Sequence, residues 1–353
     1  GVPLNQSRAG GSPVLTMNGD RWIGPGHATH LTDFAGQDWL IYHAIDVDDP
    51  YFAGSVGYTK RHPMLDPIDW VDGWPEVRSR WDATTGLETG PAAQPGTSLT
   101  YTPCRRPDDA QGDRIDALSD EFDGTVLDPR WRWIRPPDPA HFSVSGGTFR
   151  FDTEDAELYG SQNDASVLVE SAPSGDYLVE ARMSLDVPAD GCCHDYAQAG
   201  IVIYGDDDNY IKLVHASIGE SRQTEYGKEM SPVPAGYPFY GGSDAGPPGV
   251  WTWFRIARRG LPEGGARYTA YSSLDGTTWI RGATWAHVLA SGEQIGLVAM
   301  NRSGYTANFD YVRVYGLAPA SDPDAFDIDL LDSDGDGLGD ACTPDDDADG
   351  LRD

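Results

Sequence analysis

Lysine is scarce in this chain of 353 residues, which carries only Lys60, Lys212 and Lys228 and takes nearly all its positive charge from arginine. Acidic residues outnumber basic residues by 56 to 25, which gives a formal net charge of -31. A chain this acidic repels nucleic acid phosphates and anionic membrane surfaces. We therefore expect no nucleic acid partner, and we expect cations or neutral molecules such as sugars instead.

The sequence also lacks long apolar runs and helical periodicity. No run approaches the roughly 18 apolar residues that a membrane-spanning helix needs. In residues 117–317 no stretch of ten residues shows a helical repeat of apolar positions. By contrast, the 42 glycines, 26 prolines and 11 tryptophans indicate a turn-rich, aromatic β protein. The composition therefore predicts an all-β fold without a membrane span.

Cysteine is rare, and none of the four cysteines (Cys104, Cys192, Cys193 and Cys342) forms a paired Cys-x-x-Cys zinc pattern. If all four pair, three connectivities are open. A bond between adjacent Cys192 and Cys193 is strained, because consecutive Cα atoms lie closer than an ordinary disulfide prefers. In an extended segment the two side chains point to opposite sides and can take separate partners. This pattern favours an oxidising setting, so we expect a secreted or cell-surface protein.

Turn residues and apolar runs divide the chain into four parts. Residues 1–85 contain strand-like segments between Gly, Pro and Asp turns, and residues 86–116 have hardly any apolar periodicity and are interpreted as a linker. Residues 117–317 contain roughly ten apolar runs, several of which alternate with polar residues, and this pattern predicts a β-sandwich of antiparallel strands. Residues 318–353 hold thirteen Asp and one Arg, and they lack core-forming material.

The acidic tail contains an internal repeat of thirteen residues. Both units place Asp at positions 1, 3, 5 and 9, Gly at 6 and Leu at 7, and the carboxylates with the sharp-turning glycine are typical of a loop that wraps calcium. A solvated, functionless acidic tail is the alternative, but it does not require this register twice. The predicted calcium ligands are Asp332, Asp334, Asp336 and Asp340 in the first unit and Asp345, Asp347, Asp349 and Asp353 in the second. Because position 12 is Thr343 rather than Glu, the loop departs from the helix-flanked calcium hand and resembles the thrombospondin type 3 repeat, with Cys342 at a cysteine position of those repeats.

Three motifs near the start are linked by their order and spacing: Gly24–His27, Asp38–Ala44 and Asp69–Pro75, with Arg61 before the last of them. Together they resemble the end of the catalytic domain in glycoside hydrolase family 43, which includes arabinanases, arabinofuranosidases and β-xylosidases. The resemblance covers about the first 80 residues. It implies that residues 1–85 are the C-terminal portion of a five-bladed β-propeller.

The same resemblance implies roles for two residues. His27 matches the histidine that points into the central channel and helps to hold a metal ion there, commonly calcium and mostly through water. Arg61 matches an arginine of the active-site region and is predicted to bind substrate. Trp70, Trp74 and Pro75 match structural positions, whereas His30 and His43 match no role and are assigned to core or loop packing.

No catalytic residue is predicted in this chain. Glycoside hydrolysis requires two carboxyl groups that flank the scissile bond. In the family these belong to blades that precede the histidine motif, and here only 26 residues precede His27, with Asp20 as their single acid. We therefore assign no catalytic role to Asp33, Asp46 or Asp69, and we expect propeller blades to be missing upstream and this chain alone to be inactive.

Three segments of the central part, residues 142–148, 198–210 and 272–279, carry a second resemblance. They resemble the concanavalin-A-like jelly-roll domain that follows many family 43 propellers. This domain is interpreted first as a packed accessory domain. The alternative is carbohydrate binding through the aromatic loop 237–242 and through Trp251 and Trp253, which share a strand face, because flat rings stack on sugars.

Together these patterns predict the C-terminal portion of a secreted glycoside hydrolase that acts on arabinan- or xylan-type polysaccharide. The competing class is a non-catalytic, calcium-dependent carbohydrate-binding or adhesive surface protein.

We predict that the acidic tail is structured only with calcium. Addition of calcium to the isolated segment 318–353 is expected to change its circular dichroism and to slow its proteolysis, because the bound ion replaces a missing hydrophobic core. If neither signal changes, the calcium assignment fails.

Overall fold

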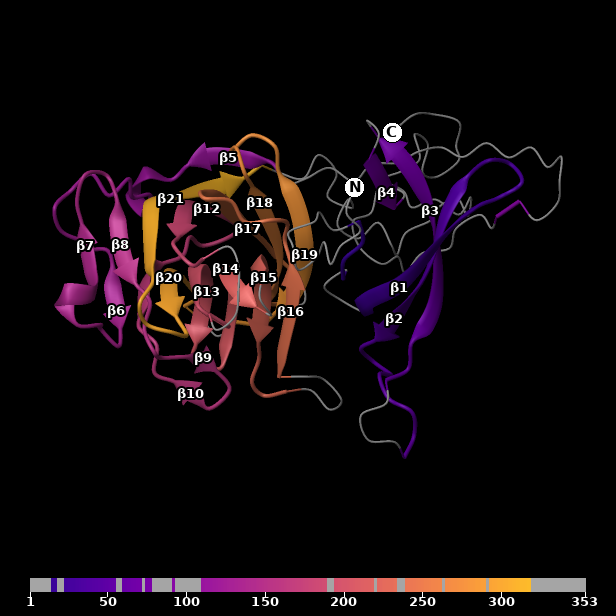
Figure 1. Ribbon diagram of the computed structural model, residues 1–353, viewed down its shortest axis with the longest axis horizontal. Helices are drawn as coiled ribbons and strands as arrows, with labels where there is room; N and C mark the ends of the chain where they lie inside the picture. The colour runs from indigo at the N-terminus through magenta and orange to yellow at the C-terminus, as the bar shows by residue number, and fades with distance from the viewer. Residues whose placement is uncertain are drawn as a thin grey trace. The chain divides into compact units, whose positions relative to one another are not determined.

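The computed structural model describes residues 14–17, 22–54, 59–71, 74–77, 91–92, 109–188, 194–218, 221–233, 239–261, 264–289 and 292–318. The chain divides into two compact units, one within Val14–Ala110 and one within Gln111–Leu317. In the described parts of both units the regular structure is β-strand, apart from two short 3₁₀ turns, η1 (Asp116–Leu118) and η2 (Pro139–His141) (Figure 1). The prediction of an all-β fold is therefore confirmed for these residues. None of their helices has the length and hydrophobicity that crossing a bilayer requires.

The smaller unit contains one four-stranded antiparallel sheet whose strands follow the chain in order. The strands are β1 (Trp22–Thr32), β2 (Asp38–Asp46), β3 (His62–Val71) and β4 (Trp74–Val77). Strand β2 buries Tyr42, Ala44 and Asp46 at alternate positions, as expected when one face of a strand packs inward. Trp22, Tyr42 and Ala44 form a small core against Leu40 and Met64.

Asp33 shapes the connection between β1 and β2. One carboxylate oxygen accepts the backbone N–H groups of Ala35 and Gln37 at 2.8 and 3.0 Å, and the other accepts the Trp39 indole N–H at 3.0 Å and the Ala92 N–H at 2.9 Å. An aspartate engaged in this way fixes a turn. These four hydrogen bonds therefore explain an aspartate at position 33 without any catalytic role.

The larger unit is a sandwich of two antiparallel sheets (Figure 1). The seven-stranded sheet has the order β16 (Tyr240–Asp244), β15 (Ser221–Glu229), β14 (Asn209–Ile218), β13 (Gln198–Asp206), β20 (Gln294–Met300), β11 (Val167–Ser171), β6 (Arg132–Ile134). The eight-stranded sheet has the order β19 (Ile280–His287), β18 (Ala266–Ser273), β17 (Thr252–Gly260), β12 (Tyr177–Leu185), β21 (Thr306–Leu317), β8 (Phe149–Asp152), β7 (Phe142–Val144), and β5 (Gln111–Arg114) also pairs with β21.

The two sheets bury rows of apolar side chains. Leu213, Ile201 and Leu297 are paired neighbours on β14, β13 and β20, and all three are fully buried. In the other sheet Ile256 and Val179 form a comparable buried pair on β17 and β12. The Tyr226 hydroxyl on β15 donates to the Tyr268 carbonyl on β18 at 2.6 Å and so joins the sheets. Burial of these side chains provides the main stabilisation of the unit.

A two-stranded hairpin covers the other face of the seven-stranded sheet. It consists of β9 (Leu158–Tyr159) and β10 (Gln162–Asn163), and Leu158 packs in one cluster with Val202, Val214 and Val298. The Tyr210 hydroxyl donates to the Leu158 carbonyl at 2.5 Å. This cover helps to explain why β13 and β14 are buried at nearly every position rather than at alternate ones.

The sandwich has more strands than the sequence suggests. The prediction is roughly ten strands in residues 117–317, whereas the described residues of Gln111–Leu317 contain seventeen, β5 to β21, of which only β5 lies before that range. The additional strands include β5, β6, β9 and β10, which are two to four residues long and too short to show a period of two. Strand β5 lies inside the range 86–116 that the composition assigns to the linker, and it pairs with β21. The eight-stranded sheet therefore includes residues that precede the apolar runs of the sequence.

We predict that Glu170 on β11 makes the stability of the sandwich depend on pH. The side chain is 2 % exposed, and both carboxyl oxygens lack a hydrogen-bond partner among the described residues. Burial raises the pKa of Glu170 to about 8, against the opposing charge of Arg130. Because the folded state holds the proton more tightly than the unfolded state, stability is full below the ordinary glutamate pKa of about 4.5 and falls as pH rises towards 8.

Urea unfolding of the full chain at pH 5 and pH 9 tests this. Glu170→Gln is expected to raise the free energy of unfolding at pH 9 by a few kcal/mol, because one pKa unit corresponds to about 1.4 kcal/mol. The same substitution is expected to have little effect at pH 5. An identical loss of stability between pH 5 and pH 9 in both proteins would contradict the assignment.

Candidate functional site

The irregular part of β1 carries His27. Gly24 has a φ of 57° and His27 itself has a φ of 56°, in the left-handed region that few non-glycine residues adopt. The pairing of β1 with β2 shifts on both sides of Gly26, which lies opposite His43. The sequence predicts a turn at residues 24–26 followed by a strand; instead these residues belong to one irregular strand, in which His27 rather than Gly26 takes the left-handed conformation. Such irregularities re-aim side chains.

His27 and Arg61 meet at His43. The ring centroids of His27 and His43 lie 6.1 Å apart with an interplanar angle of 33°. Arg61 immediately precedes β3, and its Nη1 lies 3.3 Å from His43 Nδ1. His27 and Arg61, for which the resemblance implies a function, therefore both lie beside His43. The sequence assigns His43 to packing.

The electrostatics of this cluster favour a neutral His43. Burial lowers the pKa of His43, and the positive charge of Arg61 and the neighbouring His27 lower it further. The guanidinium group donates to Nδ1, so the neutral ring carries its proton on Nε2. Because His27 and Arg61 are exposed, the cluster offers donors to a hydroxyl or carboxylate group of a ligand.

The cluster does not supply a calcium coordination shell by itself. Calcium takes six to eight oxygen ligands, whereas these three side chains offer imidazole nitrogen and a guanidinium cation. Among the described residues no group of three or more His, Cys, Asp or Glu side chains could hold a metal ion. The eight predicted aspartate ligands of the tail, and all four cysteines, lie outside the described residues. Calcium binding therefore stays a prediction.

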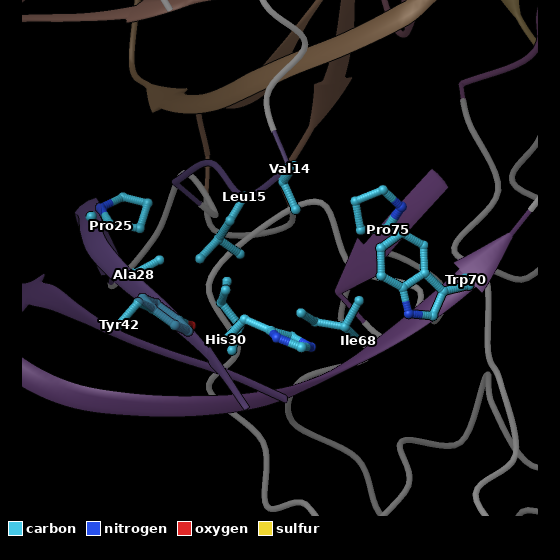
Figure 2. A pocket seen from close by; sticks show the side chains of 11 residues that line it. Val14, Leu15, Pro25, Ala28, His30, Tyr42, Ile68, Trp70 and Pro75 are labelled. Carbon is cyan, nitrogen blue, oxygen red and sulfur yellow. The ribbon is translucent and has the colours of Figure 1, made fainter. Parts of the chain in front are cut away.

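A second feature of the same sheet is an apolar hollow of about 570 Å³ (Figure 2). Its wall includes Leu40, Tyr42, Ile68 and Trp70 from β2 and β3, and Figure 2 shows Val14 and Leu15 on the opposite side of the hollow. This lining can accept an apolar or aromatic surface.

Asp38 holds two of the side chains that border the hollow. One carboxylate oxygen accepts the Trp70 indole N–H at 2.6 Å, and the other accepts the Thr32 hydroxyl at 2.6 Å and lies 2.9 Å from His30 Nε2. The Thr32 and Trp70 hydrogen bonds lower the pKa of Asp38, as does His30, against a smaller effect of burial. The sequence assigns Trp70 a structural role, and this network supplies its position. The cross-strand pairing of Thr32 with Asp38 brings these side chains together. No sequence motif predicts this pairing.

The aromatic residues considered for sugar stacking on the sandwich have other partners. Tyr240 donates its hydroxyl to the Glu225 carboxylate at 2.5 Å, and its ring lies 5.1 Å from that of Tyr159. Trp253 lies on β17, whereas Trp251 precedes that strand, and both rings pack against the Arg182 guanidinium, at 4.8 and 4.3 Å respectively. These contacts favour packing over an open stacking surface.

Two stacked antiparallel sheets of this kind define a lectin-like β-sandwich. Residues 119–315 match the family model described as the β-xylosidase C-terminal concanavalin A-like domain. The chain belongs to this family. The predicted relation of the central segment to the C-terminal domain of family 43 enzymes is thereby confirmed.

Several solved structures are similar to the chain. The GH43 protein BlXynB from Bacillus licheniformis is 19% identical over 86% of this chain and 56% of its own, with a TM-score of 0.47. Xylan β-1,4-xylosidase from Bacillus halodurans C-125 is 17% identical over 86% and 56%, with a TM-score of 0.45. A GH43B protein of the Bacteroides ovatus xyloglucan locus is 18% identical over 90% and 57%, with a TM-score of 0.44. The chain thus spans little more than half the length of these proteins, and a search of curated proteins gave no match.

We predict that Arg61 depresses the pKa of His43. Arg61→Gln removes the positive charge beside Nδ1 and is expected to raise the pKa of His43 in an NMR pH titration, and His27→Gln is expected to raise it less. Lys60→Gln serves as the control, because the Lys60 ammonium pairs with Asp49 instead. An unchanged His43 titration in Arg61→Gln would show that the two groups do not interact.

Proposed function

We propose that this chain is the C-terminal portion of a secreted glycoside hydrolase of family 43 that acts on O-glycosidic bonds of arabinan- or xylan-type polysaccharide. The observation that carries the proposal is the match of residues 119–315 to the C-terminal domain of β-xylosidases. In this proposal the sandwich is the accessory domain of the enzyme, and the sheet β1–β4 belongs to the end of its five-bladed propeller.

The arrangement of the smaller unit supports this assignment. In the proposed propeller, His27 on β1 and Arg61 just before β3 face the sugar site from either side of β2, which carries His43, and both side chains are exposed. Arg61 would donate hydrogen bonds to the substrate, while His27 would face the channel metal through water. The apolar hollow beside Trp70 and Ile68 would pack against a preceding blade, since sheets of a propeller bury their faces against one another.

The chemistry itself needs two carboxyl groups on either side of the bond. The Asp33 carboxylate is occupied by the turn that it forms, and that of Asp38 by Thr32, Trp70 and His30. In this proposal neither carboxylate acts as the general acid or base. We propose that upstream blades supply the catalytic acid and base, and that the aspartate repeats of residues 318–353 bind calcium in the extracellular medium.

The proposal predicts that the purified 353-residue chain is catalytically inert. Incubation with arabinan, xylan and the nitrophenyl glycosides of arabinose and xylose is expected to release no product, because positioning groups without a carboxyl pair do not cleave a glycosidic bond. An active family 43 enzyme assayed in parallel provides the positive control. Turnover that co-purifies with the chain and is lost in Arg61→Ala would contradict the claim that its catalytic groups lie elsewhere.

A further inference from the structure

A polar cavity of about 340 Å³ opens at one rim of the sandwich. Three loops meet there: residues 153–157 before β9, residues 194–197 before β13 and residues 301–305 between β20 and β21. The cavity is lined by Asp155, Ala156, Glu157, Gln162, Asp195, Tyr196, Asn301 and Arg302. We propose that this cavity binds a neutral sugar residue of a polysaccharide chain, independently of the propeller site described above.

Hydrogen bonds between the loops fix the walls of the cavity. The backbone N–H of Asn301 donates to the Ala156 carbonyl at 2.9 Å. The Ser303 N–H and hydroxyl donate to the two Asp155 carboxylate oxygens at 2.8 and 2.7 Å. The Arg302 Nε donates to the Asp195 carbonyl at 3.1 Å. Each loop is therefore tied to a neighbour, and a rigid site spares a ligand the entropic cost of ordering it.

Tyr196 is the aromatic residue at the opening. The residue is 57% exposed, and its side chain makes no ring contact or hydroxyl hydrogen bond with the described residues. Its backbone has a φ of 72° and is anchored from both sides, because its N–H donates to the Ser217 carbonyl at 2.6 Å and its carbonyl accepts the amide N–H of buried Gln198 at 3.1 Å. The sheet thus holds an exposed ring in a conformation that a tyrosine rarely adopts. Such conformations persist only where the surroundings impose them, and they cluster at ligand sites.

The lining combines hydrogen-bond donors and acceptors. The Glu157 carboxylate and the side-chain amides of Gln162 and Asn301 have no hydrogen-bond partners among the described residues. The same holds for the two Nη groups of Arg302. A sugar hydroxyl both donates and accepts, so it can bridge a carboxylate and a guanidinium group. The exposed ring of Tyr196 can pack against the apolar C–H face of the sugar.

Charge and donor geometry argue against other ligands. Three carboxylates against one guanidinium make the cavity negative and disfavour phosphate or uronate groups. A calcium ion is disfavoured because Asp155 already accepts from Ser303, and because no metal-binding group of three side chains occurs in the described part of the chain. A neutral sugar satisfies the donors and acceptors together.

Isothermal titration of the full chain with xylohexaose and with arabinohexaose tests the proposal. We expect binding of at least one of the two, weakened about tenfold by Tyr196→Ala, which corresponds to about 1.4 kcal/mol. Glu157→Gln and Arg302→Met are expected to weaken it several-fold, because the first replaces a charged acceptor with a weaker neutral one and the second removes the guanidinium donors. Tyr51→Ala, which removes an exposed tyrosine of the smaller unit, is the matched control and is expected to bind as the unmodified chain does.

Several outcomes would overturn the proposal. These are no heat with either oligosaccharide, binding that Tyr196→Ala, Glu157→Gln and Arg302→Met all leave unchanged, or binding of calcium alone that the Glu157 substitution abolishes. Circular dichroism of each variant separates loss of binding from loss of fold. The hydrolysis assay and the titration are independent tests. Failure of oligosaccharide binding at this cavity would overturn the present proposal and leave the expected catalytic inactivity of the chain unchanged.

Discussion

The core of the sandwich depends on the pairing of its last strand, β21, with β12 and β8. Strand β21 pairs with β12 on one side and with β8 on the other, so residues near position 310 join β12, which begins at residue 177, to β8, which begins at residue 149. Phe309 and Val312 of this strand are fully buried, and Ser119 and Asp120 hydrogen-bond to its backbone. This long-range pairing closes the core, and it explains why the family match runs from residue 119 to residue 315 as one unit.

The same pairing builds the polar cavity. Because β21 runs beside β8, the loop that precedes β21 lies against the loop that follows β8, and Asp155 meets Ser303 across 148 residues of sequence. In the smaller unit, pairing between neighbouring strands has the equivalent effect: β1, β2 and the start of β3 bring His27, His43 and Arg61 together. In both units ordinary antiparallel register places polar side chains in a common site, and local irregularities at His27 and Tyr196 direct them outwards.

Sequence reasoning reached the class of the fold and the identity of the central domain, because long alternating or apolar runs such as 198–204 and 294–300 specify strands strongly. The short strands could not be predicted, and β5 falls in the predicted linker, since Gln111–Arg114 contains no apolar side chain whose spacing could show a period. Sequence reasoning missed the role of His43 because an isolated histidine at a strand end carries no signal about its cross-strand neighbours. The cavity beside Tyr196 could not be predicted either, because its residues come from three loops that are distant in the sequence. The propeller assignment of residues 1–85 and the calcium role of the tail rest on motif resemblance and remain predictions.

The central claim is that this chain continues a family 43 propeller, and the coding sequence immediately upstream of Gly1 tests it most directly. We predict that this sequence encodes further strand-rich blades with an aspartate near the start of the first blade and a glutamate in a later one, the two carboxylates that the chemistry requires. An upstream region that encodes an unrelated domain, or blades without these two acids, would contradict the account.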